Sequence, residues 1–335
     1  MDRVRIIAEA GVNHNGDVGM AKQLIDVAAD AGADYVKFQT FNADRQVTRD
    51  ARKARYQVNA NDVSETQYQM LKDLEISSSM HEVLIDHCRK RNINFLSTGF
   101  DIESVDLLHS LGLRLFKIPS GEITNLPYLR HVGRLGCEVI LSSGMASLGE
   151  IEAALDSLEK SGLGRGQVTV LHCTTEYPAP FAEVNLNVLS ALRVSLGTRV
   201  GYSDHTTGME VSIAATALGT TVIEKHITLN RCLPGPDHAA SLEPQELKSL
   251  VASIRHIELA LGSSVKRRTP SEVANAVVAR KSIVASRAIH AGELFSAENL
   301  TTKRPGNGIS PMRWDEVLGC RAPHDFQPDE FIFLS

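Results

Sequence analysis

The sequence has few of the features that mark secreted, membrane-bound or nucleic-acid-binding proteins. Its five cysteines are odd in number and contain no C-x-x-C pair, so neither a disulfide framework nor a zinc knuckle is expected. The net charge of −5 provides no basic surface for nucleic acid or an anionic membrane. No apolar run approaches the roughly 18 residues that span a bilayer. The first residues enter a strand pattern instead of a signal peptide. We therefore expect a cytoplasmic protein with no nucleic-acid or membrane partner.

Several catalytic signatures are also missing. No G-x-G-x-x-G or G-x-x-x-x-G-K-[ST] motif occurs, so neither a dinucleotide site nor a P-loop is implied. No H-x-H motif ends the first strand-like run, which argues against the two-metal hydrolase barrels.

Short apolar runs alternate with amphipathic helical patterns along most of the 335 residues. Such alternation predicts a parallel sheet, and eight strands are the number that closes a (β/α)8 TIM barrel. A doubly wound open sheet is the alternative. The eight runs are residues 4–10, 35–40, 94–100, 115–121, 138–144, 168–173, 199–205 and 221–228.

Three segments interrupt or follow this rhythm. Residues 41–79 are too long for an ordinary loop between a strand and a helix, and inserts at the catalytic face often act as lids. The barrel pattern covers residues 1–262, and residues 263–280 are predicted to be a linker. Residues 281–335 form a small β-rich module, which is close to the lower size limit for folding alone.

Two of the runs carry a histidine at or near their end, His205 and His226. If these runs are adjacent parallel strands, both imidazoles project from the same end of the sheet. Two histidines with open positions suit a divalent ion that holds substrate oxygens. Two hydrogen-bonded core histidines are the alternative interpretation, which the nearby Asp204, Glu224 and Asp237 make less favourable.

Polar side chains follow most of the other runs, at the end where barrel enzymes build their active sites. Lys37 and Lys117 are costly to bury unless they meet anions. A single such lysine is more typical of a salt bridge or a Schiff base. Two lysines beside several hydroxyls favour a ligand that carries both phosphate and carboxylate groups.

The residues around these positions resemble the N-acetylneuraminate (sialic acid) synthase family. The similar stretches are IIAEAGVNHNGD, DYVKFQTF, FLSTGF, FKIPSGE, ILSSGM, LHCTTEYPAP, GYSDHT, IEKHITL, LPGPDHAASLEP and KRPGNG, which span nearly the whole chain in order. The resemblance implies a (β/α)8 barrel followed by an antifreeze-like (SAF) domain, in a domain-swapped homodimer. It also implies condensation of phosphoenolpyruvate with an N-acetylated mannosamine-type sugar.

The resemblance assigns a role to each matched residue. His205 and His226 would bind the metal, Mn²⁺ or Mg²⁺, and Lys37 and Thr98 the phosphoenolpyruvate carboxylate. The phosphate and enol oxygen would contact Lys117, Ser120, Ser142 and Ser203. Glu9, Glu122, Glu224 and Asp237 would line the sugar and the attacking water, with Glu122 as the base. Arg304 of the small module would reach the active site of the partner subunit and donate to the N-acetyl carbonyl.

The acceptor sugar is expected to contact Thr175, Glu176 and Tyr177 of the TTEYP stretch. This stretch resembles the legionaminate-type branch, whose acceptor is 2,4-diacetamido-2,4,6-trideoxymannose. Glu176 could accept a hydrogen bond from an acetamido N–H, or it could simply face solvent. The alternatives are N-acetylmannosamine as acceptor, a phosphorylated aldose, or a sugar-binding module without catalysis.

Overall fold

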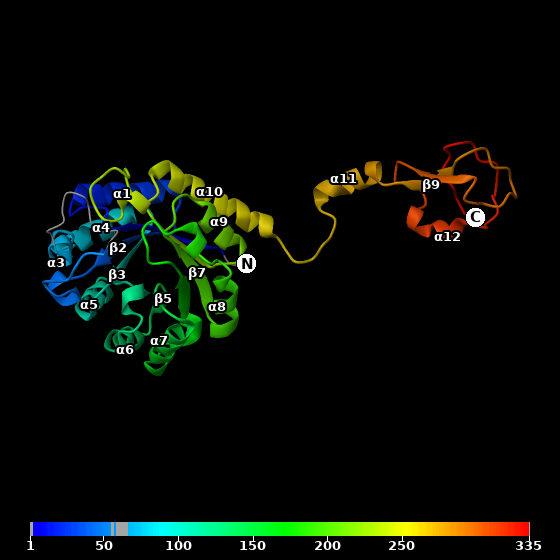
Figure 1. The fold of residues 1–335 in the computed structure, drawn as a ribbon. Coiled ribbons are helices and arrows are strands. Elements are labelled where there is room, and N and C mark those ends of the chain that lie inside the picture. Colours follow the sequence, from blue (N-terminus) through cyan, green and yellow to red (C-terminus); the bar gives the residue numbers. More distant parts are fainter. Residues whose placement is uncertain (1–2, 55–56, 58–65, 335) are drawn as a thin grey trace. The chain divides into compact units, whose positions relative to one another are not determined.

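The computed structural model describes residues 3–54, 57 and 66–334. The chain divides into two compact units, Met1–Gly262 and Ser263–Ser335. In the first unit, eight parallel strands form a closed barrel in sequence order, which confirms the predicted (β/α)8 fold (Figure 1). The strands are β1 (Arg5–Gly11), β2 (Tyr35–Thr40), β3 (Asn94–Gly99), β4 (Leu115–Ile118), β5 (Glu138–Ser142), β6 (Val168–His172), β7 (Arg199–Asp204) and β8 (Val222–His226).

Helices surround the barrel, and the apolar side chains between helices and strands form its largest core. Several helices begin at a side chain that accepts a backbone N–H of the first turn, such as Asp17, Ser77 and Ser147. The surrounding helices are α1 (Val18–Ala31), α4 (Ser78–Lys90), α5 (Ile102–Ser110), α6 (Leu126–Arg134), α7 (Leu148–Lys160), α8 (Val188–Leu196), α9 (Glu210–Ala217) and α10 (Pro244–Leu261).

The long insert after β2 contains two short helices, α2 (Ala43–Gln46) and α3 (Gln67–Asp73). Thr66 and Gln69 form a capping box at the start of α3. Residues 55–56 and 58–65 of the predicted lid lie outside the described residues.

Alternation along the strands sorts the barrel interior into layers. At the amino-terminal end, Glu138 Oε1 pairs with Arg5 Nη1 and Arg199 Nη2, each at 2.8 Å. The next layer is apolar and is buried. Its members are Ile7, Leu96, Ile140, Leu171 and Val222. The layer at the carboxyl-terminal end is polar. The apolar layer therefore separates the ion pairs of Glu138 from this polar layer.

Gly201 makes this packing possible. A Cβ atom at this position would lie 2.5 Å from Leu171 Cδ2 and 2.7 Å from the Val222 carbonyl oxygen. Only a residue without a side chain therefore leaves room for the apolar layer at β7.

Most predicted runs differ from the observed strands by a few residues at their ends, and one of them ends in a different element. The run 115–121 ends as a strand at Ile118, and Ser120–Glu122 form a 3₁₀ helix instead. Pro119 and Gly121 interrupt the pattern here, because proline cannot donate to a strand ladder.

The second unit contains α11 (Pro270–Ala279), the antiparallel strands β9 (Ser282–Ala285) and β10 (Leu300–Lys303), and α12 (Trp314–Val317). Its own core includes Ile283, Phe295 and Phe326. Helix α11 lies within the predicted linker 263–280, and Gly306 N–H donates to its Val277 carbonyl. Within the described part of the chain, no helix combines the length and apolar character needed to cross a membrane.

Candidate active site

A cavity of about 360 Å³ lies over the polar layer. Most side chains that the sequence predicts to bind substrate, metal or water line this cavity. They are Glu9, Lys37, Thr98, Lys117, Ser120, Ser142, Thr175, Tyr177, Ser203, His205, Glu224, His226 and Asp237. Parallel strands bring these distant segments together, because all eight carboxyl ends meet at one end of the barrel.

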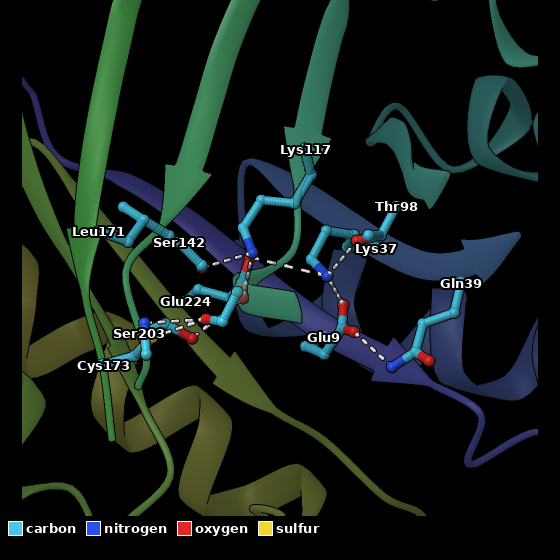
Figure 2. A network of polar contacts seen from close by, with 12 residues as sticks. Glu9, Lys37, Gln39, Thr98, Lys117, Ser142, Leu171, Cys173, Ser203 and Glu224 are labelled. Atoms are coloured by element: carbon cyan, nitrogen blue, oxygen red, sulfur yellow. Dashed lines mark hydrogen bonds and ion pairs between the residues drawn. The ribbon is translucent and has the colours of Figure 1, made fainter. Parts of the chain in front are cut away.

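Two buried lysines form the centre of the site (Figure 2). Lys37 Nζ lies 2.7 Å from Glu9 Oε2 and donates to Thr98 Oγ1 at 2.9 Å. Lys117 Nζ donates to Ser142 Oγ at 2.7 Å. Glu224 lies between the lysines, 3.7 Å from Lys37 Nζ and 3.4 Å from Lys117 Nζ. The two cations are thus held a short distance apart and are balanced by two carboxylates.

Burial and charge pairing set the protonation of this cluster. Burial raises the pKa of Glu9 to about 7, although Lys37 opposes the shift. Burial also disfavours ionised Glu224, but the two lysines and Ser203 outweigh it and lower its pKa to about 2. Burial lowers the pKa of Lys117; at Lys37 the two carboxylates overcome burial and raise the pKa. Glu224 is therefore the carboxylate that the lysines hold ionised, whereas burial favours the protonated form of Glu9.

A second corner of the cavity gathers hydroxyl groups around Gly144. Its backbone N–H donates to Ser120 Oγ at 2.9 Å. A Cβ atom on Gly144 would lie 2.1 Å from Thr175 Oγ1, 2.8 Å from Ser120 Oγ and 3.2 Å from Cys173 Sγ. Glycine at this position lets polar side chains from two segments converge, Ser120 after β4 and Cys173 and Thr175 after β6, an arrangement that suits a phosphate group.

The two histidines lie side by side, with ring centroids 5.7 Å apart. His205 Nδ1 donates to the Thr174 carbonyl at 2.6 Å, which leaves its Nε2 unprotonated. His226 Nδ1 is buried and has no hydrogen-bond partner among the described residues; it lies 3.9 Å from Asp237 Oδ2. Burial lowers the pKa of His205 to about 4 and that of His226 well below its ordinary value. Both rings are therefore neutral at pH 7, the form that binds metal ions.

These observations fit a divalent ion held by few protein ligands. Within the residues that the structure describes, no three His, Cys, Asp or Glu side chains form a metal-binding group. The imidazole pair, with the Asp237 carboxylate nearby, would leave coordination positions open for water or substrate oxygens.

Two predicted residues do not line this cavity. Glu122 is absent from its lining; its Oε2 accepts from Asn125 Nδ2 at 2.5 Å and it borders a neighbouring hollow. The early end of β4 causes this displacement, because Glu122 belongs to the 3₁₀ turn. Glu176 is exposed and does not line the cavity, which matches the solvent-facing alternative. Arg304 is exposed on the second unit.

Several other residues line the cavity, although the sequence assigned them no role. Gln39 donates to Glu9 Oε1 at 3.4 Å, and Cys173 lies beside Ser120. Period-two alternation from Lys37 and from Leu171 would have placed both on the inner face. The insert contributes Gln46, Gln57, Gln67, Met70, Leu71 and Leu74, for which the irregular polar sequence offered no comparable signal.

A barrel whose carboxyl-terminal end joins buried lysines, hydroxyls and neutral imidazoles is the arrangement of an enzyme that handles anionic substrates. Residues 24–266 match the NeuB family, and residues 280–335 match the SAF domain. The chain belongs to the NeuB family, which confirms the resemblance drawn from the sequence.

The chain is 56% identical over 332 residues to N,N'-diacetyllegionaminic acid synthase of Campylobacter jejuni, and the match covers 99% of both chains. It is 46% identical to the Legionella pneumophila protein of the same name, covering 94% of this chain and 89% of the relative. Among solved structures, N-acetylneuraminic acid synthetase from Leptospira borgpetersenii has a TM-score of 0.72 at 34% identity. That match covers 82% of this chain and 90% of the other.

Proposed function

We propose that the protein condenses phosphoenolpyruvate with 2,4-diacetamido-2,4,6-trideoxymannose and water, releasing phosphate and N,N'-diacetyllegionaminate. The observation that carries this proposal is the near-complete match to the Campylobacter jejuni synthase, combined with the buried lysine pair in the cavity. The resemblance of the TTEYP stretch to the legionaminate-type branch supports the same acceptor.

Phosphoenolpyruvate carries a carboxylate and a phosphate on the same carbon, C2, and the two lysines offer a cation to each. Lys37 with Thr98 would bind the carboxylate, and Lys117 with Ser142 and Ser120 the phosphate. An anionic ligand would meet ammonium groups that the protein already holds in position, so the cations would not need to move. Ser203 donates to Glu224 Oε1 at 3.0 Å and would hold that carboxylate in place beside the enol oxygen.

His205 and His226 would hold the Mn²⁺ or Mg²⁺ ion, with Asp237 close to the pair. When bound, such an ion supplies Lewis-acid polarisation of the acceptor carbonyl. Tyr177 packs its ring 4.1 Å from the His205 ring and 5.6 Å from the His226 ring, centroid to centroid. It thereby shields the imidazole pair on one side and borders the acceptor position.

The reaction forms a bond between C3 of phosphoenolpyruvate and the aldehyde carbon. Water then adds at C2, and the C2–O bond to phosphate breaks. Lys117 and Ser120 would stabilise the departing phosphate. A carboxylate must take the proton of the attacking water, and Glu9 lines the cavity whereas Glu122 does not. We therefore assign this role to Glu9 in place of Glu122.

The acceptor is tested by steady-state phosphate release from phosphoenolpyruvate with Mn²⁺ and each candidate sugar. We expect the highest kcat/KM with 2,4-diacetamido-2,4,6-trideoxymannose. A preference for N-acetylmannosamine would favour a sialic acid synthase, and a preference for a phosphorylated aldose would favour a heptulosonate-type enzyme. No phosphate release with any sugar would indicate a sugar-binding module.

We further propose a homodimer in which Arg304 of one chain serves the other chain's site. Its support is the resemblance of the KRPGNG stretch and the exposure of Arg304. Mixing the inactive variants Arg304→Ala and Lys117→Ala should restore part of the activity, because one site of a mixed dimer would receive neither defect. No recovery after demonstrated subunit exchange would place Arg304 outside the partner's site.

A further inference from the structure

A second polar cluster lies on the outer side of the barrel wall, directly behind the histidine pair. Asp204 and Lys225 alternate with the inward-facing residues of β7 and β8, and both are buried with at most 1% of the residue surface exposed. Lys225 Nζ lies 3.0 Å from Asp204 Oδ2 and donates to the Thr206 carbonyl at 2.5 Å. None of these groups lines the catalytic cavity.

The Asp204 carboxylate has a full set of donors besides the lysine. Thr206 donates to Oδ1 through its backbone N–H at 2.9 Å and its hydroxyl at 2.8 Å. Ser212 of α9 donates to Oδ2 at 2.6 Å. Asp204 and Thr206, the residues on both sides of His205, therefore both contact the ammonium group of Lys225. The residue that follows Lys225 on β8 is His226.

The contact between Lys225 and Asp204 lies where the pairing of β7 with β8 ends. The last paired residues of β7 and β8 are Asp204 and Lys225 themselves. Beyond them, the His205 carbonyl accepts from Ala179 and the His226 carbonyl accepts from Leu242. These bonds hold each histidine to a different neighbour, whereas Lys225 connects the two strand ends to each other.

A buried ion pair is a poor way to stabilise a fold, because the cost of desolvating two charges offsets their attraction. Well-packed apolar residues would serve the barrel wall equally well. A rigid, directional link has a different advantage, since metal sites depend on residues that hold their ligands in place.

We propose that the Asp204–Lys225 pair is a positioning clamp that fixes the separation of His205 and His226 and so sets the affinity for the divalent ion. This inference rests on the metal site of the proposed function. Asp204 and Lys225 would act through the histidines and touch neither substrate nor metal.

The test measures Mn²⁺ binding to metal-stripped protein without substrates, by calorimetry and by the electron paramagnetic resonance signal of bound Mn²⁺. The double variant Asp204→Asn/Lys225→Met removes both charges together, so no unpaired charge remains buried. We expect Mn²⁺ affinity to fall about 10- to 100-fold while the unfolding temperature changes little. A folded double variant that binds Mn²⁺ within threefold of the wild type would overturn the proposal.

A matched control separates positioning from general stability. Asp34→Asn disrupts another ion pair, with Arg255 Nη2 at 2.8 Å, and a bond from the Ile6 N–H at the opposite end of the barrel. This variant should lower the unfolding temperature without changing Mn²⁺ affinity. Equal losses of affinity in both variants would mean that the clamp acts only through stability.

Substitutions of the uncharged residue Thr206 test the clamp proposal if the double variant does not fold. Thr206→Val removes one hydroxyl donor from Asp204 and should weaken Mn²⁺ binding several-fold, whereas Thr206→Ser keeps the donor and should bind like the wild type. Identical affinities for the two would contradict the clamp.

His205→Ala provides the reference: if it leaves Mn²⁺ binding intact, the metal assignment fails and the clamp proposal fails with it. If only His205→Ala weakens binding, the clamp proposal alone is wrong.

Discussion

Substituting Gly144 by alanine tests whether the hydroxyl corner of the cavity is built for the phosphate. The added Cβ would lie 2.1 Å from Thr175 Oγ1 and 2.8 Å from Ser120 Oγ, both below the 3.0 Å that real Cβ atoms respect. Thr175 Oγ1 must therefore retreat by about 1 Å, and Ser120 Oγ must shift away from the Gly144 N–H that it accepts.

A displacement of about 1 Å in a positioning group can lower the rate about 100-fold. We expect Gly144→Ala to lose about that factor in kcat/KM for phosphoenolpyruvate. Stability should change less, because the displaced atoms border a cavity and not the packed core. The assay is continuous phosphate release at saturating sugar, with the unfolding temperature recorded for the same preparations.

Gly149 offers a matched control five residues later. A Cβ at this position, in the first turn of α7, would meet no atom of the described residues within 4 Å. Gly149→Ala should keep wild-type kinetics and gain at most about 1 kcal/mol in stability. If Gly144→Ala retained kcat/KM within threefold of the wild type, the hydroxyl corner could not be a fitted phosphate site.

Further predictions follow from single groups. Arg287, the His290 N–H and Asn299 lower the pKa of Glu293 from 4.5 to about 2, so its contribution to stability is present above pH 4.5 and is lost as the pH falls toward 2. Trp314 is the single tryptophan of the chain, and its fluorescence can follow the denaturation of the second unit. We expect the denaturation midpoint to drop between pH 5 and 3, and we expect Glu293→Gln to make this pH dependence smaller. Glu9→Gln should lower kcat at least about 100-fold, as expected for a general base, and Glu122→Gln less than about 10-fold; the reverse order would restore Glu122 as the base. A chelator should abolish turnover of the wild type and Mn²⁺ should restore it, whereas His205→Ala should remain inactive with added Mn²⁺; near-normal turnover of that variant would remove His205 from the metal site.

The barrel could be predicted because its signals are local and repeated. Each strand alternates inward and outward residues, so the positions of Glu9, Lys37, Lys117 and Glu224 at strand ends follow from counting in twos. Parallel strands then bring all of these ends to one place, and the structure gathers them in a single cavity.

The residues that could not be predicted lie where the backbone leaves this regular pattern. Glu122 follows Pro119 in a 3₁₀ turn whose direction alternation does not determine. The glutamines of the insert reach the cavity through loops of irregular length. The contact between Asp204 and Lys225 depends on the register of two strands, so neither residue reveals its role from its own segment.

Isotope tracing tests the proposed reaction most directly. Phosphoenolpyruvate labelled with ¹⁸O at the oxygen that bridges C2 and phosphorus is incubated with the enzyme, Mn²⁺ and 2,4-diacetamido-2,4,6-trideoxymannose, and the released phosphate is analysed by mass spectrometry. Water addition at C2 with cleavage of the C–O bond predicts that the label appears in phosphate in step with formation of the nine-carbon acid. Unlabelled phosphate would show cleavage of the P–O bond instead and would contradict the proposed roles of Lys117, Ser120 and Ser142.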